Sequence, residues 1–136
     1  MHNLDHIGVA VKELQSSIPL FEKLLNTNCY KKETVESEKV VTAFFKIGET
    51  KIELLQDEEA SGTISKFIER KGEGIHHIAF DVKDIRAEIE RLKKEGFIFI
   101  SEEPKKGADN KMICFLHPKS SNGILIELCE ELNDLI

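Results

Sequence analysis

The pattern of apolar and polar positions in the first half of the chain returns in the second half. The segment His6–Leu14 (HIGVAVKEL) reappears as His77–Ile85 (HIAFDVKDI), 71 positions later. In both copies a run of alternating side chains, typical of a strand, leads into apolar positions at helical spacing. The helical positions that match at this offset are Leu14, Ile18 and Phe21 in the first copy and Ile85, Ile89 and Leu92 in the second. The repeat predicts two copies of one structural unit.

Two further pairs of segments extend the repeat. Thr42–Phe45 resembles Met112–Phe115, and Ile52–Leu55 resembles Ile126–Cys129. Glycine-containing turns separate these short runs, as expected between strands. Each half is therefore predicted to be β-α-β-β-β, which places the chain in the α+β class. The expected strands span residues 4–11, 28–36, 40–47 and 50–56, and then 75–82, 97–101, 111–117 and 124–130.

A short amphipathic segment lies between the halves. Ser61–Thr63 can cap a helix that ends at Gly72. We predict a single domain over residues 1–136, with a first module at about 1–58, a connector helix at about 61–72 and a second module at about 73–136.

Proline interrupts the helical pattern of the first half. Pro19 lies in the middle of the apolar face. That helix therefore either starts late, with Ser16 or Ser17 as its cap, or bends. The sequence alone leaves both alternatives open.

Composition narrows the class of protein and its partners. The chain has 40% hydrophobic and 32% charged residues, which is typical of a soluble globular domain. Its 19 Lys and Arg against 25 Asp and Glu argue against a general nucleic-acid or anionic-membrane binder. Three cysteines without a CxxC pair favour a reducing compartment. Since no signal peptide or spanning segment is evident, we expect a cytoplasmic protein.

Each half carries one histidine and one glutamate on a sparsely filled strand face. His6 and His77 share their faces with small residues, whereas the bulky neighbours of each point the opposite way. Glu53 and Glu127 likewise point away from the apolar residues beside them. The bulky faces must pack on the helices. If the two sheets curve towards each other, these four side chains converge.

Two imidazoles and two carboxylates form a nitrogen and oxygen donor set that suits Co, Mn, Ni, Zn, Fe or Mg. Two carboxylates neutralise a divalent ion, and four ligands of an octahedral ion leave two positions for substrate oxygens, as bidentate Lewis-acid catalysis requires. A lone strand histidine or glutamate is more often structural. The matching positions in both halves favour the ligand interpretation.

The other histidines carry weaker signals. His76 points to the opposite face from its neighbour His77 and is interpreted as structural. His2 lies near the terminus. His117 precedes Pro118 at a strand end, where it is either part of a turn or part of a pocket wall.

These motifs resemble a known family. The His-Ile-Gly/Ala opening strands and the Ile-Glu-Leu closing strands are similar to the vicinal oxygen chelate (glyoxalase and bleomycin-resistance) superfamily, over nearly the whole chain. Within it, four segments resemble the methylmalonyl-CoA epimerases, namely Gly72–Phe80, Glu103–Pro104, Phe115–Ser120 (FLHPKS) and Gly123–Leu128 (GILIEL).

The resemblance implies paired modules in a pseudo-twofold repeat that forms a cupped mixed sheet, a homodimer, and a divalent metal held by His6, Glu53, His77 and Glu127. Two positions depart from relatives. Some epimerases have glutamine at the position of Glu53, and some carry a glutamate, proposed as a base, where this chain has Thr42.

The implied reaction is epimerisation of methylmalonyl-CoA by proton transfer through a metal-stabilised enolate. Glu127 is the first candidate base, as the superfamily likeness suggests, and Glu53 is its equivalent in the other half. The alternative is that both glutamates are ligands only. Thr42 is expected to contact substrate, as are Ser120, Lys111 and Lys119. For the CoA phosphates the chain offers a basic group of Lys105, Lys106, Lys111 and Lys119.

Three other functions use the same fold. A lactoylglutathione lyase would use the same four ligands on a glutathione hemithioacetal. The three arginines, Arg70, Arg86 and Arg91, all fall in predicted helices, which disfavours glutathione. A non-catalytic binding protein would not need the four ligands, and a ring-cleaving dioxygenase normally needs two histidines and one carboxylate.

Overall fold

The structure of the protein is a computed structural model, which describes residues 1–132. The chain forms two compact units. We call His6–His76 the N-unit, and Met1–Asp5 together with His77–Ile136 the C-unit. The first residues of the chain therefore belong with its second half.

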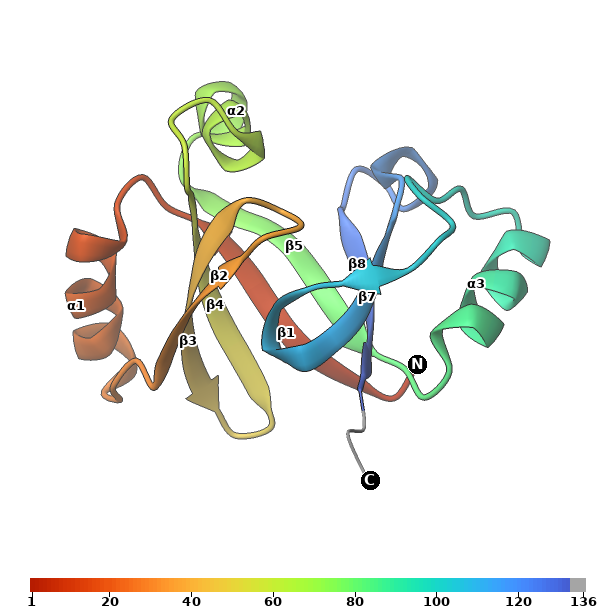
Figure 1. The fold of residues 1–136 in the computed structure, drawn as a ribbon, viewed down its shortest axis with the longest axis horizontal. Helices are drawn as coiled ribbons and strands as arrows, with labels where there is room; N and C mark the ends of the chain where they lie inside the picture. The colour runs from red at the N-terminus through yellow and green to blue at the C-terminus, as the bar shows by residue number, and fades with distance from the viewer. Residues whose placement is uncertain (133–136) are drawn as a thin grey trace. The chain divides into compact units, whose positions relative to one another are not determined.

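The N-unit contains a four-stranded sheet in the order β2-β3-β4-β1. β1 pairs with β4 in parallel, and the other neighbours are antiparallel (Figure 1). Its elements are β1 (Asn3–Ala10), which begins in the C-unit, α1 (Leu14–Leu25), β2 (Lys31–Val35), β3 (Val40–Ile47), β4 (Thr50–Asp57) and α2 (Thr63–Lys71).

The C-unit repeats this arrangement in the order β5-β8-β7-β6, with β5 and β8 parallel and the other neighbours antiparallel. Its elements are β5 (Gly74–Asp81), which begins in the N-unit, α3 (Ile85–Lys94), β6 (Lys105–Lys106), a 3-10 turn (Ala108–Asn110), β7 (Lys111–Leu116), a second 3-10 turn (Pro118–Ser120) and β8 (Ile126–Glu131). The predicted α+β class and the repeated β-α-β-β-β order are confirmed.

The first backbone amide of α1 and of α3 is capped in the same way. The N–H of Leu14 donates to Gln56 Oε1 at 2.7 Å, and the N–H of Ile85 donates to Glu130 Oε1 at 2.8 Å. Both acceptors lie on the strand that closes the unit, three residues after the glutamate of the repeat. Each closing strand thereby satisfies one unpaired donor at the start of its helix.

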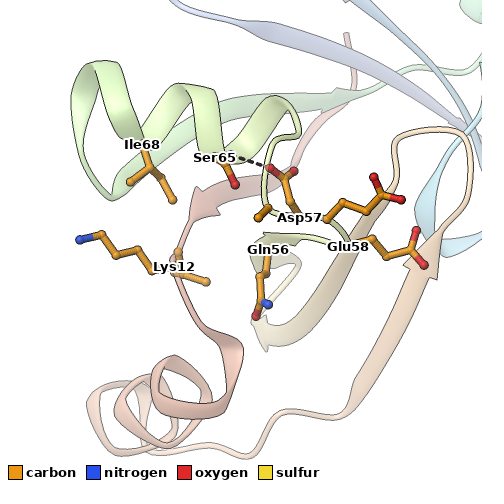
Figure 2. A pocket seen from close by; sticks show the side chains of 9 residues that line it. Lys12, Gln56, Asp57, Glu58, Ser65 and Ile68 are labelled. Carbon is orange, nitrogen blue, oxygen red and sulfur yellow. Dashed lines mark hydrogen bonds between the residues drawn. The ribbon is translucent and has the colours of Figure 1, made fainter.

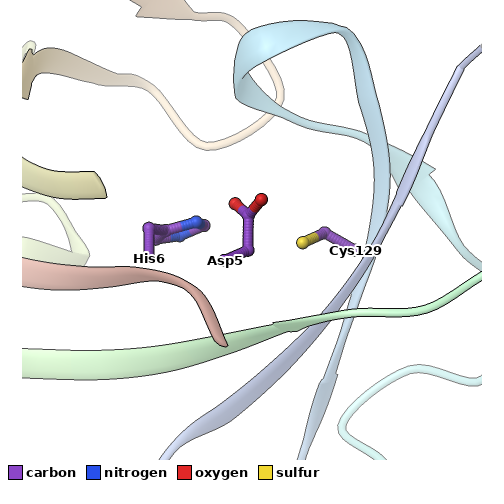
Figure 3. A group of neighbouring side chains, drawn as sticks. All are labelled: Asp5, His6 and Cys129. Atoms are coloured by element: carbon purple, nitrogen blue, oxygen red, sulfur yellow. The ribbon is translucent and has the colours of Figure 1, made fainter. Parts of the chain in front are cut away.

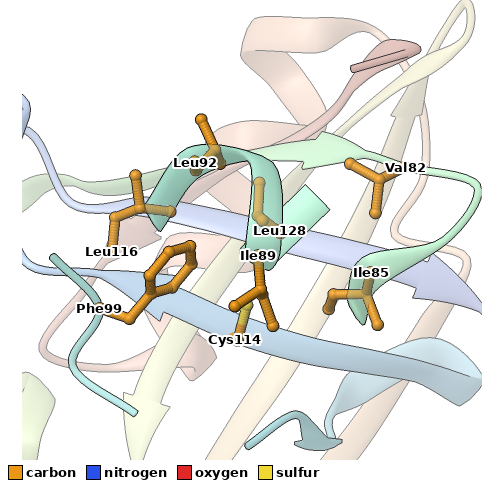
Figure 4. Close-up of a cluster of buried hydrophobic side chains, with 8 residues drawn as sticks. All are labelled: Val82, Ile85, Ile89, Leu92, Phe99, Cys114, Leu116 and Leu128. Carbon is orange, nitrogen blue, oxygen red and sulfur yellow. The ribbon is translucent and has the colours of Figure 1, made fainter. Parts of the chain in front are cut away.

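The helices bury the faces predicted from the repeat. In the C-unit the three periodic residues of α3 are buried against β7 and β8 (Figure 4). This core consists of Val82, Ile85, Ile89, Leu92, Phe99, Cys114, Leu116 and Leu128. In the N-unit Leu14 is buried with Phe45 and Leu54, and Ile18 and Phe21 pack against them partly buried.

The predicted strand at 97–101 is wrong. Only Phe99 forms a bridge, with Leu116, and the edge strand forms instead at Lys105–Lys106. Phe99 pairs with Leu116, and Lys105 pairs with Ile113. Between these two pairings the edge segment covers twice as many residues as β7 does. The residues in between must bulge away from the sheet.

The helix termini also correct two expectations. α1 begins at Leu14 and contains Pro19, so a late start at Ser16 or Ser17 is wrong. The connector helix forms as α2, but its cap is not supplied by the residues around Ser61. Instead the Asp57 carboxylate accepts the N–H groups of Ile64 and Ser65, at 3.0 and 2.6 Å. Within residues 1–132 no helix combines the length and apolarity that crossing a membrane requires.

Candidate functional site

The N-unit brings His6 and Glu53 together. They lie on the neighbouring parallel strands β1 and β4, where Gly8 is in register with Glu53, so both side chains point to the same face. Nδ1 of His6 lies 3.3 Å from Oε2 of Glu53. The two residues are 5% and 3% exposed, so this pair lies in an interior where interactions between polar groups are strong.

The C-unit contains the matching pair. His77 on β5 and Glu127 on β8 share a face, because Ala79 is in register with Glu127. Nε2 of His77 lies 3.1 Å from Oε1 of Glu127, and both residues are buried. The His77 ring also packs edge-on against Phe115, with 5.8 Å between ring centroids. This packing restrains the orientation of the imidazole.

Bulky apolar residues on the opposite face of each sheet pack against the helices. The histidine and glutamate side chains therefore lie on the face that does not pack against these helices. Ile52 and Leu54 flank Glu53 and pack in the core beside α1. Ile126 and Leu128 flank Glu127 and pack beside α3. Each unit thus presents a buried imidazole next to a buried carboxylate, a donor pair that suits a divalent cation.

Thr42 lies on the face of the N-unit sheet that carries His6 and Glu53. It is in register with Leu55 on β4 and is 1% exposed, so it shares the face of Glu53. On β2, the neighbouring strand opposite to β4, Thr42 is in register with Glu33. Oε1 of Glu33 lies 3.5 Å from Nζ of Lys31. Glu33 and Lys31 alternate along β2, so both side chains point to the same face of the strand.

Lys111 differs from the other lysines of the basic group. Its Nζ donates to Asp5 Oδ1 at 3.1 Å, and both residues are buried. The Asp5 carboxylate and the Cys129 thiol each have a potential ligand atom, and these atoms lie within 4.8 Å of each other. Figure 3 shows the two side chains as neighbours. Burial alone would lower the pKa of Lys111, but the charge and hydrogen bond of Asp5 outweigh it and raise that pKa.

The remaining lysines of that group are exposed. Lys105 and Lys106 form β6, and Lys119 lies in the turn after β7. In the same turn the Ser120 hydroxyl donates to the carbonyl of His117 at 2.9 Å and accepts the N–H of Ile98 at 3.3 Å. Ser120 therefore ties this turn to the edge of the sheet.

Two buried thiols lie in the C-unit. Burial, followed by the charge of Glu127, raises the pKa of Cys114 to about 12. Burial is also the main cause that raises the pKa of Cys129. A thiol held protonated is a poor nucleophile.

A cavity of about 400 Å³ in the N-unit lies beside α2 and is lined by Lys12, Gln56, Asp57 and Ser65 among others (Figure 2). Asp57 caps α2 and Gln56 caps α1. These two lining side chains are therefore engaged by helix termini.

Comparison with known proteins places the chain in a family. The sequence profile of the glyoxalase/bleomycin resistance protein/dioxygenase superfamily matches residues 5–115. The chain belongs to this superfamily. The matched range includes His6, Glu53 and His77.

Relatives within the superfamily include epimerases. The chain is 37% identical to the ethylmalonyl-CoA/methylmalonyl-CoA epimerase of Cereibacter sphaeroides, over 92% of this chain and 95% of that protein. It is 38% identical to the uncharacterised protein YqjC of Bacillus subtilis, over 98% and 96%. A solved variant of Streptomyces coelicolor methylmalonyl-CoA epimerase, in complex with 2-nitronate-propionyl-CoA, has a TM-score of 0.91 at 29% identity and covers 96% of this chain and 95% of that chain. Superfamily membership and similarity to methylmalonyl-CoA epimerases, both expected from the motifs, are confirmed.

Proposed function

We propose that the protein catalyses the metal-dependent epimerisation of methylmalonyl-CoA. The observation that carries the proposal is the buried histidine–glutamate pair that recurs in both units, at 3.3 Å in one and 3.1 Å in the other. Such a repeated donor pair, in a chain with epimerase relatives over 92% of its length, supports a chelating site for a substrate with two oxygens.

The proposed ligands are His6, Glu53, His77 and Glu127, which would hold one divalent ion. Their two imidazole nitrogens and two carboxylates match Co, Mn, Ni, Zn or Mg, which share this preference for nitrogen and oxygen donors. When bound, the ion supplies Lewis-acid polarisation of the thioester carbonyl and the carboxylate that flank the acidic carbon.

Epimerisation removes a proton from one face of that carbon and delivers a proton to the opposite face. The C–H electron pair moves into the thioester carbonyl and returns when the new C–H bond forms, so no oxidant or reductant is needed. We propose Glu127 as one proton-transfer group and Glu53 as the other, because each carboxylate is oriented by a histidine of its own unit. The competing assignment leaves both glutamates as ligands only.

Four other residues are proposed to contact the substrate. Lys119, exposed in its turn, suits a CoA phosphate. Thr42, Ser120 and Lys111 remain proposed contacts, although the Ser120 hydroxyl and the Lys111 ammonium already bond within the protein. A single domain, a homodimeric state and a cytoplasmic location complete the proposal, and rest on the sequence and the superfamily resemblance.

The decisive experiment follows methylmalonyl-CoA by proton NMR in deuterated water with metal-loaded protein. We expect exchange of the acidic proton together with interconversion of the two epimers, and loss of both after treatment with a chelator. A parallel assay uses the hemithioacetal of methylglyoxal and glutathione. If only the hemithioacetal is turned over, the protein is a lactoylglutathione lyase. If neither compound is turned over, both enzymatic assignments are rejected.

A further inference from the structure

Two isoleucines at the edge of the C-unit remain exposed although they belong to an ordered, hydrogen-bonded segment. Ile98 is 47% and Ile100 is 58% exposed. Phe99 between them is 8% exposed and packs in the core beside α3. The segment therefore places its aromatic residue inside and its two aliphatic residues outside.

Hydrogen bonds set the face on which these isoleucines lie. The N–H of Ile100 donates to the Phe115 carbonyl at 2.9 Å, and the N–H of His117 donates to the Ile98 carbonyl at 2.7 Å. With Phe99 opposite Leu116 on the helix side, alternation places Ile98 and Ile100 on the other side. That side is the one that carries Glu127.

The distance to Glu127 follows from the sheet. Ile100 lies beside Phe115, which is in register with Glu127 on β8. Two interstrand spacings separate Ile100 from Glu127, about 10 Å. We take Glu127 to act at the carbon next to the thioester carbonyl. In an extended CoA thioester, the atoms that follow the sulfur then lie about 10 Å from Glu127, beside Ile100.

The turn after β7 holds the segment in place and adds polar groups at its end. Ser120 Oγ accepts the N–H of Ile98 and donates to the carbonyl of His117. Nδ1 of His117 accepts the N–H of Lys119 at 3.2 Å, which orients the ring. The exposed Lys119 ammonium thus lies in the turn that is bonded to Ile98.

We propose that Ile98 and Ile100 form the binding surface for the pantetheine arm of a CoA thioester, with Lys119 at the phosphate end. The inference rests on the proposed function, because it takes Glu127 as the reacting end. The methylene and dimethyl groups of the arm pack on the two isoleucines. The anionic phosphates lie next to the Lys119 ammonium. This sequence of apolar and then cationic groups matches the chemistry of the arm from sulfur to pyrophosphate.

The test replaces both isoleucines by serine (I98S/I100S) and compares thioesters of two lengths. Propionyl-CoA and the propionyl thioester of N-acetylcysteamine are titrated into metal-loaded protein by calorimetry, so turnover is not needed. We expect the variant to lose affinity for propionyl-CoA on the order of tenfold, as burial of two partly exposed aliphatic side chains implies. The affinity for the short thioester should change less than about twofold, within a few tenths of a kcal/mol.

Ile47 supplies the matched control, because it is an isoleucine of similar exposure, 42%, in the other unit. The variant I47S should bind both thioesters like the wild type. Equal losses for both thioesters in I98S/I100S, or no loss for either, would overturn the proposal. So would a change of oligomeric state on sedimentation, since the isoleucines would then contact a second copy of the chain.

The proposed function can fail separately. A wild-type protein that binds propionyl-CoA through the isoleucines but does not epimerise methylmalonyl-CoA would refute the reaction and keep the binding surface. A third variant, K119M, extends the test. It should weaken binding of propionyl-CoA but leave that of propionyl-pantetheine, which lacks the phosphates, unchanged; equal weakening of both would reject the phosphate assignment.

Discussion

Nε2 of His77 lies 3.1 Å from Oε1 of Glu127, with both side chains buried. The two residues come from parallel, hydrogen-bonded strands that are separated in sequence by a helix and two strands. The same relationship joins His6 to Glu53 in the N-unit. This recurrence makes the ligand assignment testable one histidine at a time.

The variant H77A is expected to lose metal binding and epimerase activity together, because it removes one of the four proposed ligands. Loss of a ligand weakens a divalent site by orders of magnitude, whereas loss of a supporting contact costs about 10–100-fold. Metal content after dialysis, measured by plasma emission spectrometry, checks the prediction.

H76A is the matched control. His76 is the adjacent histidine, and its ring packs edge-on against Phe67 at 4.9 Å. This variant should retain full metal content. Stoichiometric metal in H77A, or an equal loss in both variants, would contradict the assignment of His77.

The buried ion pair of Lys111 and Asp5 should be coupled energetically. Removing one partner leaves the other charge buried and unpaired, so K111M or D5L alone should lower the free energy of unfolding by about 3–5 kcal/mol. The double variant D5L/K111M should be much less destabilised than the sum. Urea denaturation of the four proteins gives the coupling, and additive single effects would show that the pair is not coupled.

The three thiols should differ in reactivity. Cys29 is partly exposed, whereas Cys114 and Cys129 are buried. We expect an aromatic disulfide reagent at neutral pH to modify Cys29 in the folded protein, and all three cysteines only after unfolding. The variant C29S should be nearly unreactive while folded. Rapid modification of a second thiol in that variant would contradict the buried placement.

The raised pKa of Cys114 predicts a dependence of stability on alkaline pH. The pKa rises from 9.0 to about 12 on folding, so the folded state holds this proton more tightly than the unfolded state. The resulting stabilisation is complete below pH 9 and is lost as pH rises towards 12. Relative to C114A, the wild type should lose unfolding free energy over this range; parallel pH profiles of the two proteins would disprove the linkage.

The matched helix caps predict matched costs. Gln56 accepts from Leu14 and Glu130 from Ile85, at 2.7 and 2.8 Å. The variants Q56A and E130A should each lower the unfolding free energy by about 1 kcal/mol, as removal of a helix-capping side chain does. Thermal unfolding followed by circular dichroism measures both. A cost confined to one variant would mean that the two bonds do not have equivalent roles.

Much of the candidate site follows from sequence alone. Alternation along a strand has a period of two, so it reveals that His6 and His77 lie opposite bulky residues without knowledge of the partner strand. The 71-residue repeat then matches each histidine and glutamate in one half to its equivalent in the other. The helical spacing of Ile85, Ile89 and Leu92 identified the buried face of α3.

Other features depended on contacts that no local pattern contains. Lys111 and Asp5 are 106 residues apart, and their pairing arises because the first residues of the chain join the C-unit. The position of the edge segment is another such feature. Phe99 and Lys105 both pair with β7, and the register of these two pairings determines that the residues between them bulge away from the sheet. Local sequence determined which side of each element is apolar. Strand order and register decided which distant residues meet, because these depend on the free energy of the whole packed unit.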